Sequence, residues 1–298
     1  MTARTDDKLG VLNSGLAQRP PLRWVAVDLT GPLRDASRRL DLSPVDAGAL
    51  GRCLTGAVLV QRMSLKTPSR LVLGVSGDGP LSRVMAEVGE DGEIRGMVSD
   101  PRVEVPLAEP SELGVGRAIG NGILRVWREG TGLTYQSQVE VSRGGIGEAL
   151  ATFLAQSEQT RSAVLLGVLA GAEGISAAGG MMVEALPGGE DADLVSLESR
   201  LGDLESISRV LASRGLRGLI EDVVGTSRFT ITESREIRYR CRCSVPDIRA
   251  HLCRLEPEAR AGMRSSNGRL EAECVFCGTV YRFDEADTVD RVTVSETG

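Results

Sequence analysis

The segment YRCRCS at residues 239–244 and the segment CVFCG at residues 274–278 decide the fold of the C-terminal part of this chain. Together they hold four of the six cysteines. A tetrahedral metal requires two close pairs of thiols joined by a spacer, because each pair supplies two of four ligands. A thiol switch requires the same arrangement, because each close pair can form a disulfide. The two segments therefore indicate a metal centre, a redox switch, or both.

The residues around each pair are expected to aim the sulfur atoms at one point. Residues 236–240 alternate like a β-strand, in which side chains two apart face the same side, so the sulfurs of Cys241 and Cys243 can meet one metal. The second pair is expected in a turn between two short strands, where Gly278 is free to take a positive φ. Zinc binds thiolate at about 2.3 Å, which sets the sulfurs roughly 3.8 Å apart. The predicted ligands of a structural zinc ion, Zn²⁺, are Cys241, Cys243, Cys274 and Cys277.

The thirty residues between Cys243 and Cys274 are expected to fold as an insert with its own helix. Ser244 and Asp247 form an N-terminal capping pattern, and apolar residues at helical spacing follow it. The residues of that apolar face are Ile248, Leu252 and Leu255. Tyr281 and Phe283 are expected to cover the metal. Four thiolates on one zinc ion carry a formal charge of −2, which we expect to be offset in part by Arg238, Arg240 and Arg242.

Loss of zinc would leave vicinal thiols in both pairs. Cys274 and Cys277 can approach the Cα separation of about 5.5 Å that a disulfide prefers. Cys241 and Cys243, if extended, lie near the upper limit of that separation, so we expect the Cys274–Cys277 pair to oxidise first. Because metal-binding energy is folding energy in so small a unit, oxidation is expected to unfold it.

The composition is that of an ordinary soluble globular protein, with 298 residues, 41% hydrophobic and 26% charged. A net charge of −6 and a pI near 5.2 argue against a nucleic-acid partner. Residues 1–10 show no apolar core of a secretory signal, and the longest apolar stretch, 163–172, falls short of the about 20 residues that a membrane helix needs. We therefore expect a cytoplasmic protein without a membrane partner, in which clustered cysteines bind metal or are redox-active.

Residues 21–187 are expected to form a mixed α+β domain. The segments with strand patterns, separated mostly by glycine turns, are 24–29, 70–76, 81–88, 94–98, 123–128, 133–141, 162–169 and 180–186. Helical patterns occupy residues 43–66, which begin with Ser43 as N-cap and Pro44 in the first turn, and residues 147–159. Mostly local hairpins with few helices favour an α+β class over a doubly wound one.

The rest of the chain is expected to divide into three parts. Residues 1–20 are polar and lack periodicity, which predicts a disordered tail. Residues 188–230 predict a helical linker with an apolar stripe, interrupted by Gly202, Gly215 and Gly218. The stripe consists of Leu194, Leu197, Leu201, Leu204, Ile207 and Leu211. Such a stripe must dock on another surface, and residues 231–298 are expected to form the zinc-binding redox-switch domain.

Other candidate residues have simpler explanations. Cys53 lies on an apolar helix face and is expected in the core. His251 is not needed as a ligand when four thiolates fill the shell, and Cys253 is expected to take no part in the bridges. The glycine-rich segments 77–80 and 174–180 suit a turn and a loop better than a phosphate-binding loop. The chain has a single histidine and shows no nucleophile paired with a general base, so we do not expect an enzyme.

The cysteine segments at residues 239–244 and 274–277, together with Tyr281-Arg-Phe283, resemble the redox-regulated 33 kDa chaperonin (heat shock protein 33) family. Further landmarks resemble that family in the same order: Gly77-Asp-Gly-Pro80, Arg95-Gly96, Gly120-Asn-Gly122, Tyr135-Gln136, Gln156-Ser-Glu-Gln159 and Ala177-Ala-Gly-Gly-Met181. The resemblance runs from about Leu22 to the end of the chain.

The resemblance implies an ATP-independent holdase whose reduced, zinc-bound form is inactive. It implies that oxidants form a disulfide within each close pair, Cys241–Cys243 and Cys274–Cys277, that zinc leaves, and that the zinc unit and linker unfold. It further implies a homodimer after oxidation and unfolding client proteins as partners.

Two other classes of protein stay open from the residues alone. A nucleic-acid-binding zinc ribbon is compatible with the short cysteine turn and the nearby arginines, although the acidic pI, the few aromatic residues and the lack of a basic stripe count against it. An enzyme that uses zinc is disfavoured, because four thiolates leave no open coordination position for water.

Overall fold

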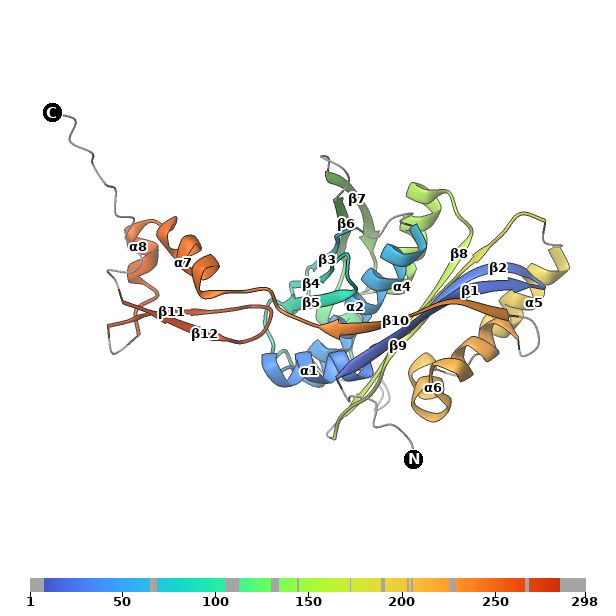
Figure 1. The fold of residues 1–298 in the computed structure, drawn as a ribbon, viewed down its shortest axis with the longest axis horizontal. Helices are drawn as coiled ribbons and strands as arrows, with labels where there is room; N and C mark the ends of the chain where they lie inside the picture. The colour runs from blue at the N-terminus through green and yellow to red at the C-terminus, as the bar shows by residue number, and fades with distance from the viewer. Residues whose placement is uncertain are drawn as a thin grey trace. The chain divides into compact units, whose positions relative to one another are not determined.

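The structure is a computed structural model, which describes residues 8–64, 69–105, 113–129, 134–143, 145–171, 173–188, 191–202, 204, 206–225, 229–265 and 268–284. The chain divides into two compact units, Met1–Arg240 and Cys241–Gly298 (Figure 1). In the described part, no helix is both long enough and apolar enough to cross a membrane. The α+β class predicted from the sequence is confirmed.

The described part of the first unit contains one large sheet. Its strands are β1 (Leu9–Gln18), β2 (Pro21–Asp28), β3 (Leu71–Gly77), β4 (Arg83–Val88), β5 (Glu93–Val98), β6 (Gly122–Glu129), β7 (Thr134–Val141), β8 (Ser162–Gly171), β9 (Gly174–Ala185) and β10 (Phe229–Tyr239). Their order across the sheet is β7-β6-β3-β4-β5-β10-β1-β2-β9-β8. Neighbouring strands are antiparallel except for the parallel pair β5 and β10.

Helices connect and cover these strands. In the first unit they are α1 (Thr30–Leu40), α2 (Pro44–Ser64), α3 (Val115–Ile119), α4 (Ile146–Phe153), the π-helical turn η1 (Leu154–Glu158), α5 (Asp191–Gly202) and α6 (Ile207–Val224). The second unit contains α7 (Val245–Cys253), α8 (Pro257–Ala261) and the hairpin of β11 (Leu270–Glu273) and β12 (Val280–Phe283).

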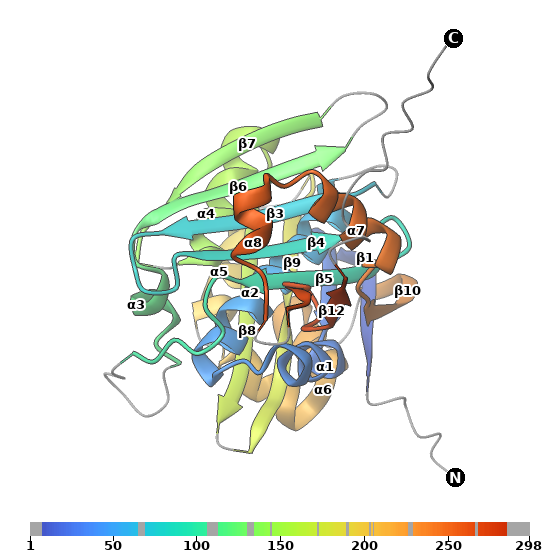
Figure 2. The same cartoon turned by 90° about the vertical axis from the view of Figure 1, so that its left-hand side faces the viewer.

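Strand β2, in the interior of the sheet, is buried on both faces, which explains its nearly continuous apolar sequence. Val25 and Val27 belong to one hydrophobic cluster, whereas Trp24 and Ala26 belong to another. Successive side chains point to opposite faces of a strand, so the two clusters lie on opposite faces of the sheet. Helices α1, α2 and α4 contribute to the first cluster and α6 to the second (Figures 1 and 2).

Helix α2 begins where the capping pattern predicts. The Ser43 hydroxyl oxygen accepts a hydrogen bond from the Asp46 N–H at 3.2 Å, and its hydroxyl donates to the Asp46 carboxylate at 2.5 Å. The predicted end near Lys66 lies outside the described residues. The helix predicted over 147–159 is observed as α4 continued by η1.

The prediction of a disordered tail is wrong for residues 8–20, because Leu9–Gln18 form β1 inside the sheet. Strand β1 pairs antiparallel with β2 on one side and with β10 on the other. Asn13 and Ser14 obscure its alternation, so a sequence window detects the strand only weakly. Its backbone hydrogen bonds come in part from a distant strand, which no local pattern encodes. Residues 1–7 lie outside the described residues.

The glycine-rich segment 174–180, expected as a loop, instead forms the first half of β9. Gly180 pairs with Val27 of β2 and with Leu166 of β8. A Cβ atom on Gly180 would lie 2.1 Å from the carbonyl oxygen of Leu165, so glycine is required by close backbone approach. Gly179 and Gly180 reflect tight strand packing, whereas Gly174, with a φ of 93°, lies at the turn between β8 and β9.

The boundary of the C-terminal unit also differs from the prediction at residue 231. Strand β10 belongs to the first unit, where it lies between β5 and β1. The Tyr239 hydroxyl donates to the Gly96 carbonyl oxygen at 2.9 Å and accepts from the Gly96 N–H at 3.3 Å. The alternation of residues 236–240 predicts a strand but does not show to which unit the strand belongs. The sequence analysis therefore placed this strand in the C-terminal unit, which is wrong.

The helical linker predicted over 188–230 contains α5 and α6, both within the first unit. Gly215 has a φ of 67° and interrupts α6, as a glycine at that position suggests. Three stripe residues, Leu197, Ile207 and Leu211, are buried in the second hydrophobic cluster. The stripe is therefore packed against the sheet, while the side chain of Leu194 lies outside the described residues.

Candidate metal centre

The second unit is small, and α7 packs on the β11–β12 hairpin. Ser244 is the N-cap of α7: its hydroxyl oxygen accepts from the Asp247 N–H at 3.3 Å. The buried members of the hydrophobic cluster in the described part of this unit are Leu252, Leu270, Ala272 and Phe283. Leu255, predicted on the same helix face, is exposed. An apolar cluster of this size is too small to stabilise an independent unit without a further constraint.

The first pair of thiols follows directly after β10. Cys241 and Cys243 lie in the non-helical segment before α7, and both are part-buried. The N–H of Cys243 lies 3.5 Å from the Sγ of Cys241. A backbone N–H directed at sulfur stabilises a thiolate there, whether or not a metal is bound.

The second pair occupies the tight turn between β11 and β12. The N–H groups of Cys277 and Gly278 both donate to the carbonyl oxygen of Cys274, at 3.1 and 2.8 Å. Gly278 has a φ of 67°, which L side chains rarely adopt, and this confirms why glycine follows the pair. Both sulfur-bearing residues of the turn are buried.

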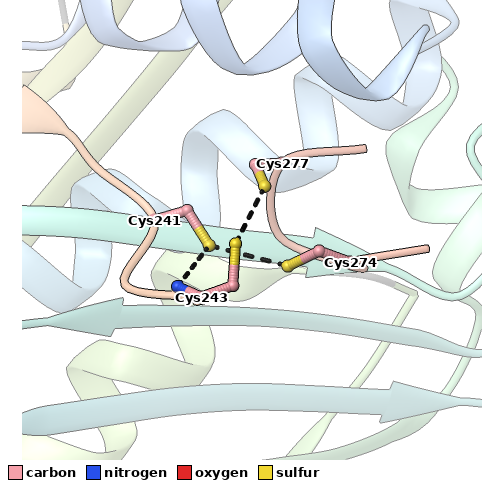
Figure 3. A group of neighbouring side chains, drawn as sticks. All are labelled: Cys241, Cys243, Cys274 and Cys277. Carbon is pink, nitrogen blue, oxygen red and sulfur yellow. Dashed lines mark hydrogen bonds between the residues drawn. The ribbon is translucent and has the colours of Figure 1, made fainter. Parts of the chain in front are cut away.

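All four sulfur atoms lie within 4.8 Å of one another (Figure 3). The Sγ atoms of Cys241 and Cys274 are 3.6 Å apart, and those of Cys243 and Cys277 are 3.5 Å apart. Four thiolates around a tetrahedral zinc ion would be roughly 3.8 Å apart, so this spacing fits such an ion. The chain thus brings together the four residues that the spacing in the sequence singled out.

The thiols of the cluster differ in pKa. Burial raises the pKa of Cys274 and of Cys241. Burial also acts to raise the pKa of Cys277, but hydrogen bonding to Thr279 and to neighbouring thiols outweighs it and lowers the pKa to about 7. A divalent metal must displace the remaining protons, so its affinity should fall as the pH falls.

Two residues beyond the cysteines support the cluster. The Tyr281 hydroxyl donates to the Sγ of Cys243 at 3.0 Å, and this hydrogen bond raises the pKa of Tyr281 to about 12. The Thr279 hydroxyl lies 3.2 Å from the Sγ of Cys277, and its carbonyl oxygen accepts from the Cys274 N–H at 3.0 Å. Tyr281 was expected over the site. Thr279 was missed, although a hydroxyl just after the turn glycine was a visible signal.

Two of the three arginines expected to offset the charge of the cluster, Arg238 and Arg240, have carboxylate partners. Arg238 forms an ion pair with Glu236 at 2.8 Å, and Arg240 forms one with Glu93 at 2.6 Å. Both guanidinium groups are therefore bound to carboxylates of the first unit. The charge of the cluster is relieved locally by N–H and O–H donors such as Tyr281.

The remaining thiols and the histidine lie outside the cluster. Cys53 is fully buried in α2, where burial strongly raises its pKa, as expected for a core residue. Cys253 is part-buried at the end of α7 and is not among the clustered thiols. His251 is exposed, and its Nδ1 lies 2.7 Å from the Asp247 carbonyl oxygen. Within the described residues, none of these three joins the four sulfurs.

Comparisons with known proteins agree with one another. A family model described as "Hsp33 protein" matches residues 11–284. A 33 kDa chaperonin of Thermus thermophilus is 41% identical over 287 residues, covering 92% of this chain and 84% of that protein. A 33 kDa chaperonin of a Picosynechococcus species is 38% identical over 275 residues, covering 91% of this chain and 92% of that protein.

A solved structure is similar over nearly the whole chain. It is the crystal structure of the 33 kDa chaperonin (heat shock protein 33 homolog) of Thermotoga maritima, with a TM-score of 0.83 and 32% identity. The match covers 94% of this chain and 96% of that chain.

Proposed function

This chain belongs to the Hsp33 family of chaperones, and from that premise we propose that it is an ATP-independent holdase switched on by oxidation. In its reduced form Cys241, Cys243, Cys274 and Cys277 hold a zinc ion, and the protein is inactive. Oxidation then releases zinc, unfolds the second unit and loosens α5 and α6. The clients are unfolding proteins, which bind to the apolar surface that is uncovered.

The observation that carries the proposal is the meeting of four thiols in a unit with very little apolar core. The four sulfurs lie within 4.8 Å of one another, and the buried apolar cluster of this unit has four members in the described part. Metal binding supplies roughly 10–16 kcal/mol of folding free energy in small structural zinc domains. Because this unit depends on its metal for folding, any reaction that modifies the thiolate ligands also unfolds the unit. The unit therefore responds to oxidants.

Peroxide is an oxidant that the switch can use with balanced chemistry. A thiolate attacks one peroxide oxygen, which gives a sulfenic acid and hydroxide, and the neighbouring thiol then displaces water to form the disulfide. Each disulfide thus takes two electrons from two thiols and turns one hydrogen peroxide into two molecules of water. Two peroxides convert the four ligands into two disulfides, whose sulfurs no longer hold zinc.

The link between the second unit and α6 runs through β10. Cys241 follows Tyr239, the last residue of β10, by two positions, and α6 ends shortly before β10 begins. Only two residues of β10, Arg238 and Tyr239, pair with β5. This short pairing with β5 is expected to fray first when the chain beyond it unfolds. The pairing of β10 with β1 extends along most of the strand and must loosen before α6 is released.

We expect the peroxide-treated protein to suppress aggregation of a heat-denatured client and the reduced zinc form to leave it unaffected. The measurement is light scattering of the client with each form, with released zinc recorded by a colorimetric chelator in the same samples. Activity should appear in step with zinc release. Equal suppression by both forms would contradict the switch, and zinc release without activity would contradict its coupling to client binding.

Disulfide formation is expected to begin with Cys274 and Cys277, followed by Cys241 and Cys243. In the folded cluster, close sulfur contacts also join Cys241 to Cys274 at 3.6 Å and Cys243 to Cys277 at 3.5 Å, across the two pairs. A cross-bridge of that kind closes a loop of about 30 residues in the unfolded unit, which costs roughly 2 kcal/mol more than closing a few residues. Thiol trapping and mass spectrometry during a peroxide titration will give the order, and early cross-bridges would refute it.

Homodimerisation after oxidation and a cytoplasmic location complete the proposal. Sedimentation of the oxidised and reduced forms tests the first, with a shift from one chain to two expected only on oxidation. A nucleic-acid-binding zinc ribbon is not favoured, since the family match spans nearly the whole chain and the relatives are chaperonins.

A further inference from the structure

A pocket with a volume of about 1130 Å³ lies in the first unit, apart from the four cysteines. It is formed where the start of α6 meets α2, α3 and β8. Nothing in the proposed redox cycle uses this pocket. Its volume lies slightly above the range of about 300–1,000 Å³ that is typical of small-molecule sites.

The polar lining of the pocket is basic. Its charged residues are Arg52, Arg117, Arg143 and Arg209, and none of the described residues that line it is acidic. These arginines come from four different places in the chain, so their meeting is a result of the tertiary fold. We call this cavity the arginine pocket. Its net charge contrasts with the −6 of the whole chain.

Within the part of the chain that the structure describes, three of these arginines have no acidic partner. Among the described residues, no carboxylate forms an ion pair with Arg52, Arg143 or Arg209. The side chain of Arg52 donates to the carbonyl oxygen of Gly48 at 3.3 Å, and burial lowers its pKa. Arg52 is part-buried, so its guanidinium without a counter-charge is costly, because its desolvation is not repaid by a partner. Arg143 and Arg209 are exposed, which leaves their guanidinium groups open to a ligand.

The start of α6 adds uncharged donors to the same cavity. Ser206 is the N-cap of α6 but makes no side-chain capping hydrogen bond, and its Oγ lies 3.0 Å from the Oγ of Ser208. The positive end of the helix dipole therefore points at the pocket with its first N–H groups uncapped by a side chain. A Cβ on Gly167 of β8 would lie 2.7 Å from the Ser208 nitrogen, so glycine lets α6 begin directly against β8.

We propose that the arginine pocket binds a small anion that carries two or more phosphate groups. Arginine side chains recognise phosphate oxygens with paired N–H donors, and the helix start and serine hydroxyls suit the remaining oxygens. A single phosphate would leave most of the volume and several guanidinium groups unused. The apolar residues on the wall of the pocket, such as Leu113 and Val168, leave room for an organic group attached to the phosphates.

The site joins α6 to the rest of the first unit. Arg209 belongs to α6, whereas Arg52 belongs to α2 and Arg143 follows β7. An anion held by all three should stabilise the docked position of α6. Bound ligand then raises the thermal midpoint and slows amide hydrogen exchange in residues 207–213.

The test is calorimetric titration of the full-length, reduced, zinc-bound protein with tripolyphosphate and, separately, with ADP. Saturable binding at one site per chain is expected for at least one of them, together with a rise in thermal midpoint. Sodium sulfate at matched ionic strength should produce neither effect. Tighter binding of ADP assigns the apolar wall to an organic group, and tighter binding of tripolyphosphate assigns the whole cavity to phosphates. Absence of saturable binding of both overturns the proposal.

The variant Arg143→Gln/Arg209→Gln locates the binding. Each charge-assisted contact is equivalent to about 10- to 100-fold in affinity, so the double variant should bind at least about 100-fold more weakly. Arg217→Gln is the matched control, because Arg217 lies on α6 but pairs with Glu221 outside the pocket, and it should bind within about twofold of the parent. Without ligand the double variant should be no less stable than the parent, since it removes unpaired like charges. Undiminished binding by the double variant would place the anion elsewhere and refute the site.

The outcome is independent of the redox proposal. The titration uses only the reduced form and does not measure chaperone activity. Failure of the phosphate site would leave the zinc switch intact, and failure of the switch would leave the binding measurement unchanged.

Discussion

The Cys274→Ser variant is expected to bind zinc at least about 100-fold more weakly and to lose the tertiary structure of the second unit. Structural zinc contributes roughly 10–16 kcal/mol to small zinc domains, so one of four equal ligands accounts for roughly 2.5–4 kcal/mol. That difference corresponds to about 100- to 1,000-fold in affinity. The measurements are zinc content by chelator titration and the near-ultraviolet circular dichroism of the full chain.

The physical reason lies in the weakness of everything else in that unit. The buried members of its apolar cluster in the described part are Leu252, Leu270, Ala272 and Phe283. Cys274 also positions the turn, since its carbonyl oxygen accepts from the N–H groups of Cys277 and Gly278. Serine preserves these backbone contacts, so a loss of structure in the variant would be due to the missing sulfur.

Cys253→Ser is the matched control for this experiment. Cys253 lies in the same unit and is part-buried, but it is not among the clustered thiols. Its replacement should leave zinc content at the parent level and should not alter the order of disulfide formation. If Cys274→Ser retained a full complement of zinc and a native spectrum, the four-thiolate site would be refuted.

The Leu219→Ala variant is expected to suppress client aggregation even when reduced and zinc-bound. Leu219 is completely buried on α6, in the cluster that also holds Trp24 and Met181. Truncating a buried leucine costs roughly 2–5 kcal/mol, which is a large part of the stability of a typical domain. The loss acts on the docking of α6, so it should mimic the loosening that we assign to oxidation. Light scattering of a denaturing client measures the effect.

Undocking of α6 uncovers the sheet face beneath it. Trp24, Ala177 and Val183 lie on that face, and each is buried in the same cluster. Exposed apolar surface of this kind is what a holdase needs to retain unfolding clients. The gain of activity in Leu219→Ala should therefore be accompanied by increased binding of a hydrophobic dye.

Val195→Ala is the control within the same helical region. Val195 is 62% exposed on α5, so its truncation should change stability by less than about 0.5 kcal/mol. The reduced Val195→Ala protein should be as inactive as the parent. A reduced Leu219→Ala protein that is destabilised and yet inactive would show that α6 does not cover the client-binding surface.

Local patterns in the sequence predicted local structure well. The capping residues Ser43 and Ser244 marked the starts of α2 and α7, because a cap acts within a single turn of helix. Gly278 marked the cysteine turn, because a positive φ excludes most other residues. Burial of the stripe residues Ile207 and Leu211 was foreseen from their helical spacing.

Patterns failed where distant partners decide the structure. Strand β1 was taken as a disordered tail, since its pairing with β10 joins opposite ends of the first unit. The glycine-rich start of β9 was predicted as a loop. Its close packing against β2 and β8 depends on strands distant in the sequence, so a local sequence pattern does not show it. Arg238 and Arg240 were assigned to the metal centre, but the carboxylates of Glu236 and Glu93 bind them.

The sequence by itself determined which four thiols form the cluster, because they come in two pairs whose geometry is set within three or four residues, and a shared site needs only that the pairs meet. The tertiary structure alone decided where the linker docks and that β10 lies inside the sheet. It alone brought Arg52, Arg143 and Arg209 to one cavity. Such features depend on contacts between residues far apart in the chain, whose free energy is gained only when the whole sheet forms.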